Sequence, residues 1–156
     1  MDWKKAWLEI FTEAFEGVKP GADGTYFVNG DEALFPILES LSPEQASKRA
    51  NENVNSIAAH GRHAAYYVSL INMQNRGEKV DPDWKGSWSV QSVDEGSWDT
   101  IRADLRRQYT EFRDWMVKHD GNLDEETGMY VMAQLAHAAF HLGSIRQLAM
   151  SSETHS

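Results

Sequence analysis

Apolar residues return every three or four positions along most of the chain, a spacing that places them on one face of an α-helix. The pattern predicts four long amphipathic helices, over residues 2–16, from about 55 or 56 to 76, from about 92 to 119 and from about 124 to 150. Gly17 and Pro20 follow the first helix and Gly77 follows the second, so we expect these helices to end there. No segment shows the period-two alternation that would compete for a strand.

Helix-capping residues mark two further starts. Ser42, Pro43 and Gln45 form a capping signature that predicts a brief helical turn. Ser92 and Glu95 have the spacing of a second capping box, which would open the third long helix.

The connections between these helices are long. Residues 18–30 are rich in glycine and predict a loop from which the side chains of residues 26–28 tuck back against the protein. A short helix is expected over residues 31–41, with Pro36 near its start or at a kink. Residues 78–97 show no sustained helical period and form a connection of a length that is often functional.

These elements predict an all-α protein, a four-helix bundle with long crossover connections. A chain of 156 residues has the size of a single domain. We place this domain at residues 1–150 and expect a flexible tail over residues 151–156.

Composition narrows the partners and the ligands. The formal net charge of −9 makes nucleic acid and anionic membranes poor partners, and no apolar run is long enough for a membrane span. The chain has no cysteine, which excludes disulfides and thiolate ligands and fits a reducing cytoplasm. Any bound metal must therefore be held by imidazole and oxygen.

Four of the six histidines lie on two predicted helices. His137 and His141 are four residues apart, a common spacing for zinc ligands, and both leave the inward face of the closing helix. No glutamate follows His137, so the pair is not the motif of the HExxH metalloproteases. His60 and His63 lie on the inward stripe of the second long helix. Taken alone, the spacing is equally compatible with partly exposed histidines at the edge of a bundle.

The run from His137 to Gln147 resembles the last-helix signature of the DinB-like superfamily, in which two histidines precede a glycine and an isoleucine. Ser56 and Ile57, followed by His63, resemble the second-helix pattern of that family, where a serine-capped helix carries one histidine. The segment 42–45 upstream is also similar to members of the family.

The resemblance implies a DinB-like four-helix bundle that holds a divalent metal, zinc or nickel first among the candidates, on three histidines. By motif position these ligands are His63, His137 and His141. His60, one turn before His63, is the alternative third ligand or a base behind the ligands.

Three functions follow as hypotheses. The first is a metal-dependent enzyme acting on a small molecule, because members of the family resemble hydrolases or transfer low-molecular-weight thiols such as bacillithiol or mycothiol. The second is a non-catalytic metal-binding or stress-associated bundle. The third is a binding module that uses the tryptophan-rich connection. A homodimer could form through a helix pair, and the aromatic first helix is the candidate surface.

The connection carries Trp84 and Trp88 on either side of Lys85–Ser87. These tryptophans could form a lid or wall over the metal. We favour the simpler interpretation that they fill the gap left by a long crossover, because aromatic side chains mostly serve burial.

Overall fold

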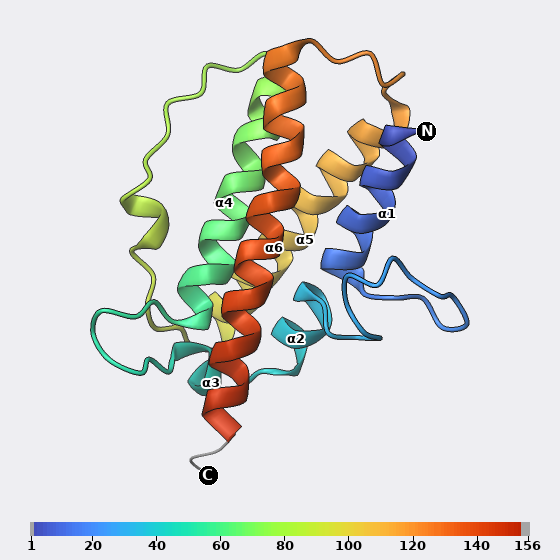
Figure 1. The fold of residues 1–156 in the computed structure, drawn as a ribbon. Coiled ribbons are helices and arrows are strands. Elements are labelled where there is room, and N and C mark those ends of the chain that lie inside the picture. Colours follow the sequence, from blue (N-terminus) through green and yellow to red (C-terminus); the bar gives the residue numbers. More distant parts are fainter. Residues whose placement is uncertain (1, 154–156) are drawn as a thin grey trace.

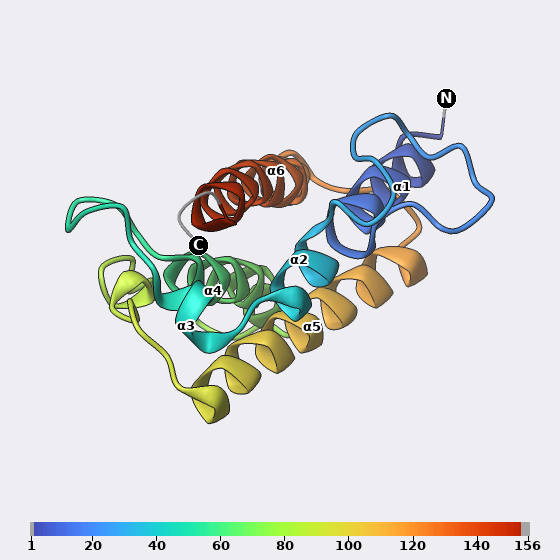
Figure 2. The same cartoon turned by 90° about the horizontal axis from the view of Figure 1, so that it is seen from below.

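The structure is a computed structural model that describes residues 2–153. Its four long helices form the bundle: α1 (Trp3–Glu16), α4 (Ile57–Asn75), α5 (Glu95–Lys118) and α6 (Glu125–Glu153). Helices α5 and α6 lie on opposite sides, and each packs against both α1 and α4 (Figures 1 and 2). Within the described range there is no strand, so the predicted all-α class is confirmed.

Shorter elements lie in the crossovers. Helices α2 (Leu34–Ser40) and α3 (Pro43–Ser47) cover one end of the bundle between α1 and α4 (Figure 1). A 3₁₀ turn, η1 (Gly86–Trp88), lies in the connection from α4 to α5 and packs against α4. Pro36 occupies the first turn of α2, where its missing N–H removes no helical hydrogen bond.

The aromatic face of α1 lies in the core of the bundle. Trp7, Phe11 and Phe15 are at most 3% exposed, and Phe11 stacks against Tyr109 of α5. The indole N–H of Trp7 donates to the carbonyl oxygen of Val131 in α6, which ties α1 to the helix opposite α5. These aromatic side chains are therefore covered within the chain, and dimerisation through other positions of α1 stays a prediction.

Most predicted helix starts are confirmed, and one capping box was wrong. Ser42 and Gln45 make the predicted reciprocal box at α3. At α5 the box joins Asp94 and Ser97 rather than Ser92 and Glu95, because the aspartate carboxylate accepts from the Ser97 backbone N–H. Asp94, two positions after Ser92, thus supplies a stronger hydrogen-bond acceptor for the helix N-terminus than the serine hydroxyl would.

The loop after α1 folds back in a different way from the prediction. Val28 is buried as expected, but Tyr26 is 93% exposed and Phe27 is also exposed. The attachment comes instead from Glu13, whose buried carboxylate accepts from the backbone N–H groups of Thr25, Phe27 and Val28.

At the other terminus, α6 continues to Glu153, three residues into the predicted tail. Residues 154–156 lie outside the described part of the chain. No helix within residues 2–153 is both long and apolar enough to cross a membrane.

Close packing of α4 on α5 positions the histidines of α4. Gly61 lies between His60 and His63 and faces Ile101 of α5. A Cβ atom added at Gly61 would lie 3.4 Å from Ile101 Cγ2 and 3.8 Å from Trp98 Cζ3, an ordinary contact. The interface therefore has room for one methyl group and for little more.

We expect Gly61→Ala to raise the free energy of unfolding by about 0.5–1 kcal/mol, because alanine loses less backbone entropy than glycine in a helix. Gly61→Leu should lower it by about 1–3 kcal/mol, because the larger side chain overpacks the α4–α5 interface. Urea unfolding of both variants measures the two effects. A destabilised Gly61→Ala variant would contradict the spacing described for this interface.

Candidate metal centre

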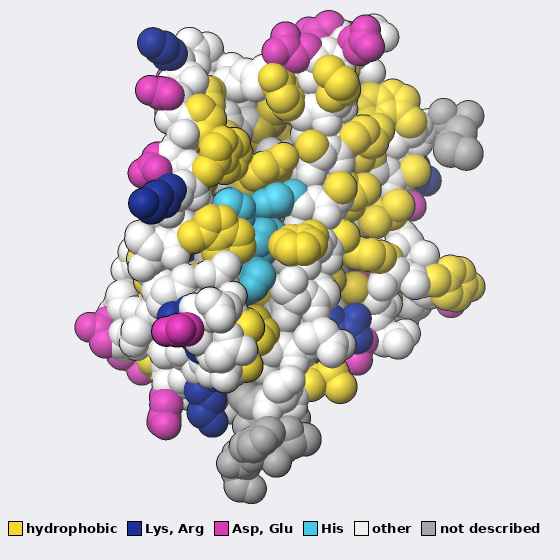
Figure 3. Space-filling model, turned by 60° about the vertical axis from the view of Figure 1, so that its left-hand side comes forward, with side chains coloured by type: hydrophobic (Ala, Val, Ile, Leu, Met, Phe, Trp, Pro, Cys, Tyr) yellow, Lys and Arg dark blue, Asp and Glu magenta, His cyan; other side chains and the backbone are white. Residues whose placement is uncertain are grey.

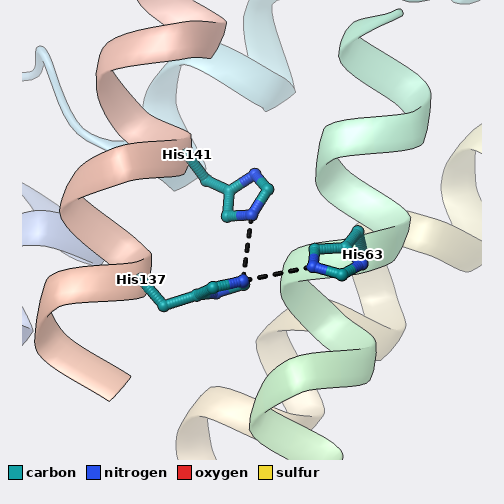
Figure 4. A group of neighbouring side chains, drawn as sticks. All are labelled: His63, His137 and His141. Carbon is teal, nitrogen blue, oxygen red and sulfur yellow. Dashed lines mark hydrogen bonds between the residues drawn. The ribbon is translucent and has the colours of Figure 1, made fainter. Parts of the chain in front are cut away.

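Helices α4 and α6 bring four histidines together in the middle of the bundle. His60 and His63 are one turn apart on α4, and His137 and His141 are one turn apart on α6. The rings of His63, His137 and His141 point toward one another across the gap between the two helices (Figure 4). His141 is fully buried, and His60 and His63 are less than a tenth exposed.

Three ring nitrogens converge on one point. Nε2 of His137 lies 3.2 Å from Nε2 of His63 and 3.1 Å from Nε2 of His141 (Figure 4). The three side chains can each offer one ring nitrogen within 4.8 Å of the others. The predicted residues His63, His137 and His141 are thus the three that the fold places in one cluster.

The outer nitrogen of His63 has a partner that fixes its tautomer. Its Nδ1 lies 2.7 Å from Oγ of Ser87, and the hydroxyl of Ser87 donates to the carbonyl oxygen of Trp84 at 2.7 Å. The Ser87 oxygen is therefore free to accept, so the His63 proton sits on Nδ1. This leaves the Nε2 lone pair of His63 facing the centre of the cluster.

His60 lies behind His141 rather than in the cluster itself. Its Nδ1 is 2.9 Å from Nδ1 of His141, on the side of that ring turned away from His137. His60 can therefore accept the Nδ1 proton of His141 and leave Nε2 of His141 free as a ligand. Of the two roles foreseen for His60, the geometry fits the supporting one.

Aromatic rings form walls around the cluster. Trp88 stacks on His63 with ring centroids 4.0 Å apart, and Tyr67 stacks on His137 at 3.6 Å. Trp84 lies 6.4 Å from the His63 ring and 6.0 Å from Tyr67. Hydrophobic side chains surround the histidines on the face shown in Figure 3, where the cluster is still visible from outside.

Burial keeps all four rings neutral. Removal from water, together with the smaller effect of neighbouring histidines, lowers the pKa of His141 to about 2, of His137 to about 3 and of His63 to about 4. Burial also lowers the pKa of His60. Neutral imidazole is the form that coordinates a metal, so the cluster needs no deprotonation at neutral pH.

The donor set fits a divalent ion. Two nitrogen ligands on a tetrahedral zinc ion lie about 3.3 Å apart, since each Zn–N bond is about 2.0–2.1 Å. The two measured N–N distances, 3.1 and 3.2 Å, are close to this value. Without a cation only one of the two contacts can be a hydrogen bond, because His63 presents a lone pair and Nε2 of His137 has at most one proton.

The sequence did not identify the groups that support these histidines. Ser87 and Trp88 belong to the connection whose tryptophans were expected mainly to fill the gap left by a long crossover. In the structure both residues contact His63 directly. Tyr67 of α4 is the ring on which His137 stacks. The unusual density of tryptophan between residues 84 and 88 was the available signal. His119 lies apart from this cluster, at the end of α5.

Comparison with known proteins identifies the family. A family model described as the DinB superfamily matches residues 26–145, from the first loop to most of α6. The chain therefore belongs to the DinB superfamily. The comparison with curated proteins gave no match, and neither did the comparison with solved structures.

The supporting hydrogen bonds can be tested by zinc affinity. We expect Ser87→Ala and His60→Ala each to weaken zinc binding about 10–100-fold while the stoichiometry stays at one, because each removes the partner that orients a ligand. Ser89→Ala is the matched control, since within residues 2–153 the Ser89 hydroxyl donates to the backbone oxygen of Gly86 and contacts no histidine. Competition with a zinc-binding dye measures the affinities. Unchanged affinity in both variants would contradict these roles.

The depressed pKa values also predict a pH dependence for the metal-free protein. Histidines in the unfolded chain take up protons near their ordinary pKa of 6.5, whereas the folded chain resists protonation to much lower pH. This stability is fully present above about pH 6.5 and is lost as the pH falls. The urea midpoint with chelator present should therefore be constant from pH 8 to 7 and decrease steadily toward pH 5. A flat profile between pH 7 and 5 would show that these rings are not buried as neutral groups.

Proposed function

We propose that this member of the DinB superfamily is a divalent-metal-dependent enzyme, with zinc or nickel on His63, His137 and His141. The observation that carries this proposal is the convergence of three neutral ring nitrogens from two helices on one point. Three protein ligands leave a coordination position for substrate, the arrangement typical of catalytic rather than structural zinc sites.

An ion held there would supply Lewis-acid activation of a thiolate or a water molecule. The chain itself holds the ligand nitrogens in place through Ser87 and His60 and surrounds them with Trp88 and Tyr67. These aromatic walls exclude bulk water, which strengthens every electrostatic interaction inside the site.

Thiol transfer is the reaction that the surroundings support best. Among the described residues, no carboxylate joins the three-histidine group, and the ionisable side chains that contact it are His60 and Tyr67, whose pKa is raised by burial. Hydrolysis ordinarily uses a general base to take a proton from the attacking water. A thiol that arrives as a thiolate needs no such base. Its sulfur forms a bond to an electrophilic carbon, and the leaving group departs with its electron pair.

The thiol must come from a second molecule. The chain has no cysteine of its own, so the proposal requires a low-molecular-weight thiol as co-substrate. Bacillithiol and mycothiol are the candidates that relatives of this type suggest. Ester or amide hydrolysis remains the alternative activity.

The absence of a carboxylate from the three-histidine group, among the described residues, also favours a second candidate, a metal-binding bundle without turnover. This candidate shares the ligand set and differs only in whether the remaining coordination position is used.

The proposal is tested by turnover of zinc- and nickel-loaded protein with 1-chloro-2,4-dinitrobenzene as acceptor and cysteine, glutathione, bacillithiol or mycothiol as donor. We expect at least tenfold acceleration over the uncatalysed rate with one donor, lost on chelation and in His137→Ala. Turnover that survives chelation would contradict metal dependence. Bound metal with no turnover, here or on p-nitrophenyl esters, would favour the non-catalytic candidate.

A further inference from the structure

A cavity of about 340 Å³ opens beside the histidine cluster, between α4, α6 and the connection that carries Trp84. Its walls include Tyr67, Leu70, Val80, Trp84, Tyr130 and Gln134. This volume lies in the range of small-molecule sites. The cavity shares two walls with the cluster, because Tyr67 stacks on His137 and Trp84 lies against the ring of His63.

The lining is uncharged and largely apolar, and three of its side chains are aromatic. None of the residues that line the cavity is Asp, Glu, Lys, Arg or His. The side chains of Trp84 and Tyr130 are each nearly half exposed, so their rings are available to a ligand. The hydroxyl of Tyr130 donates to the carboxylate of Glu126 at the surface, which adds negative charge near the mouth. Such walls favour flat apolar groups and disfavour anions.

One residue of the lining, Gln134, carries a buried polar atom without a partner among the described residues. Gln134 is 5% exposed, and its side-chain oxygen Oε1 is buried without a hydrogen bond among the described residues. Its amide nitrogen donates to the carbonyl oxygen of Tyr67 at 3.4 Å, which leaves the oxygen as an acceptor. A buried acceptor without a donor costs free energy, and a ligand O–H or N–H would satisfy it.

We infer that this cavity binds the substrate's electrophilic part, and that this part is an uncharged aromatic group carrying one hydrogen-bond donor. The donor bonds to Oε1 of Gln134, and the ring packs against Tyr67 and Trp84. Gln134 is one helical turn before the ligand His137, so a group bound to Gln134 would lie near the metal. The catalytic role of this cavity therefore rests on the proposed function. Binding itself does not require the metal.

The test uses three probes of the same ring system: 2-naphthol, 2-methoxynaphthalene and 2-naphthoate. Calorimetry with the full chain, zinc-loaded and after chelator treatment, measures their affinities. We expect one 2-naphthol per chain in both forms. In the chelator-treated protein 2-naphthoate should bind at least tenfold more weakly, because the lining has no cation to meet its charge.

Two sets of variants locate the site. Leu70→Trp and Val80→Trp fill the cavity and should weaken 2-naphthol binding at least tenfold, whereas Val117→Trp, on the exposed surface of α5, should not. Gln134→Leu should weaken binding of 2-naphthol several-fold and leave 2-methoxynaphthalene unchanged, because the methyl ether has no donor for Oε1. Zinc content should stay at one per chain in Leu70→Trp and Val80→Trp.

Equal affinity for 2-naphthoate in the chelator-treated protein, no binding of 2-naphthol, or undiminished binding in both filled variants would overturn the inference. These results are separate from those that test the proposed function. Binding of 2-naphthol by a protein that holds no metal would support the cavity assignment and contradict the proposed metal-dependent activity. Metal binding by a protein that binds none of the probes would contradict the cavity assignment and leave the proposed metal centre in place.

Discussion

Three imidazole nitrogens directed at one point between α4 and α6 are the constraint on which the rest of the structure depends. Nε2 of His137 has nitrogen neighbours at 3.1 and 3.2 Å, and the proton of His63 is held on its outer nitrogen by Ser87. Hydrogen bonding alone cannot satisfy such a set, whereas a cation satisfies all three nitrogens together. The arrangement is therefore stable only because the surrounding helices hold it.

The bundle holds it by packing on both sides. Helix α4 is seated on α5 through Gly61, and α6 is tied to α1 by the hydrogen bond from Trp7 to the carbonyl of Val131. The connection after α4 then closes over His63 with Trp88. Two of the aromatic side chains that bury the histidines and lower their pKa values also line the neighbouring cavity. The metal ligands and the cavity therefore depend on the same packing.

Periodicity and capping chemistry were sufficient to predict the helices, because both are local properties of the sequence. They predicted the inward direction of His63, and the family signature added the Ser56 cap of α4 and the pairing of α4 with α6. The connection that carries Ser87 has no period, and its position depends on contacts with residues distant in sequence. The choice between the two roles foreseen for His60 was also beyond prediction, because His60 and His63 are one helical turn apart and only the facing ring of His141 distinguishes the supporting residue from the ligand.

The most direct test of this account is the metal content of tag-free protein, measured by elemental mass spectrometry after purification and after reloading with zinc or nickel. The account predicts close to one ion per chain in the unaltered protein and in His60→Ala under saturating metal, and none in His63→Ala or His137→Ala. Metal retained in His63→Ala but lost in His60→Ala would assign the third ligand to His60. Protein that takes up no ion after reloading would contradict the metal centre itself.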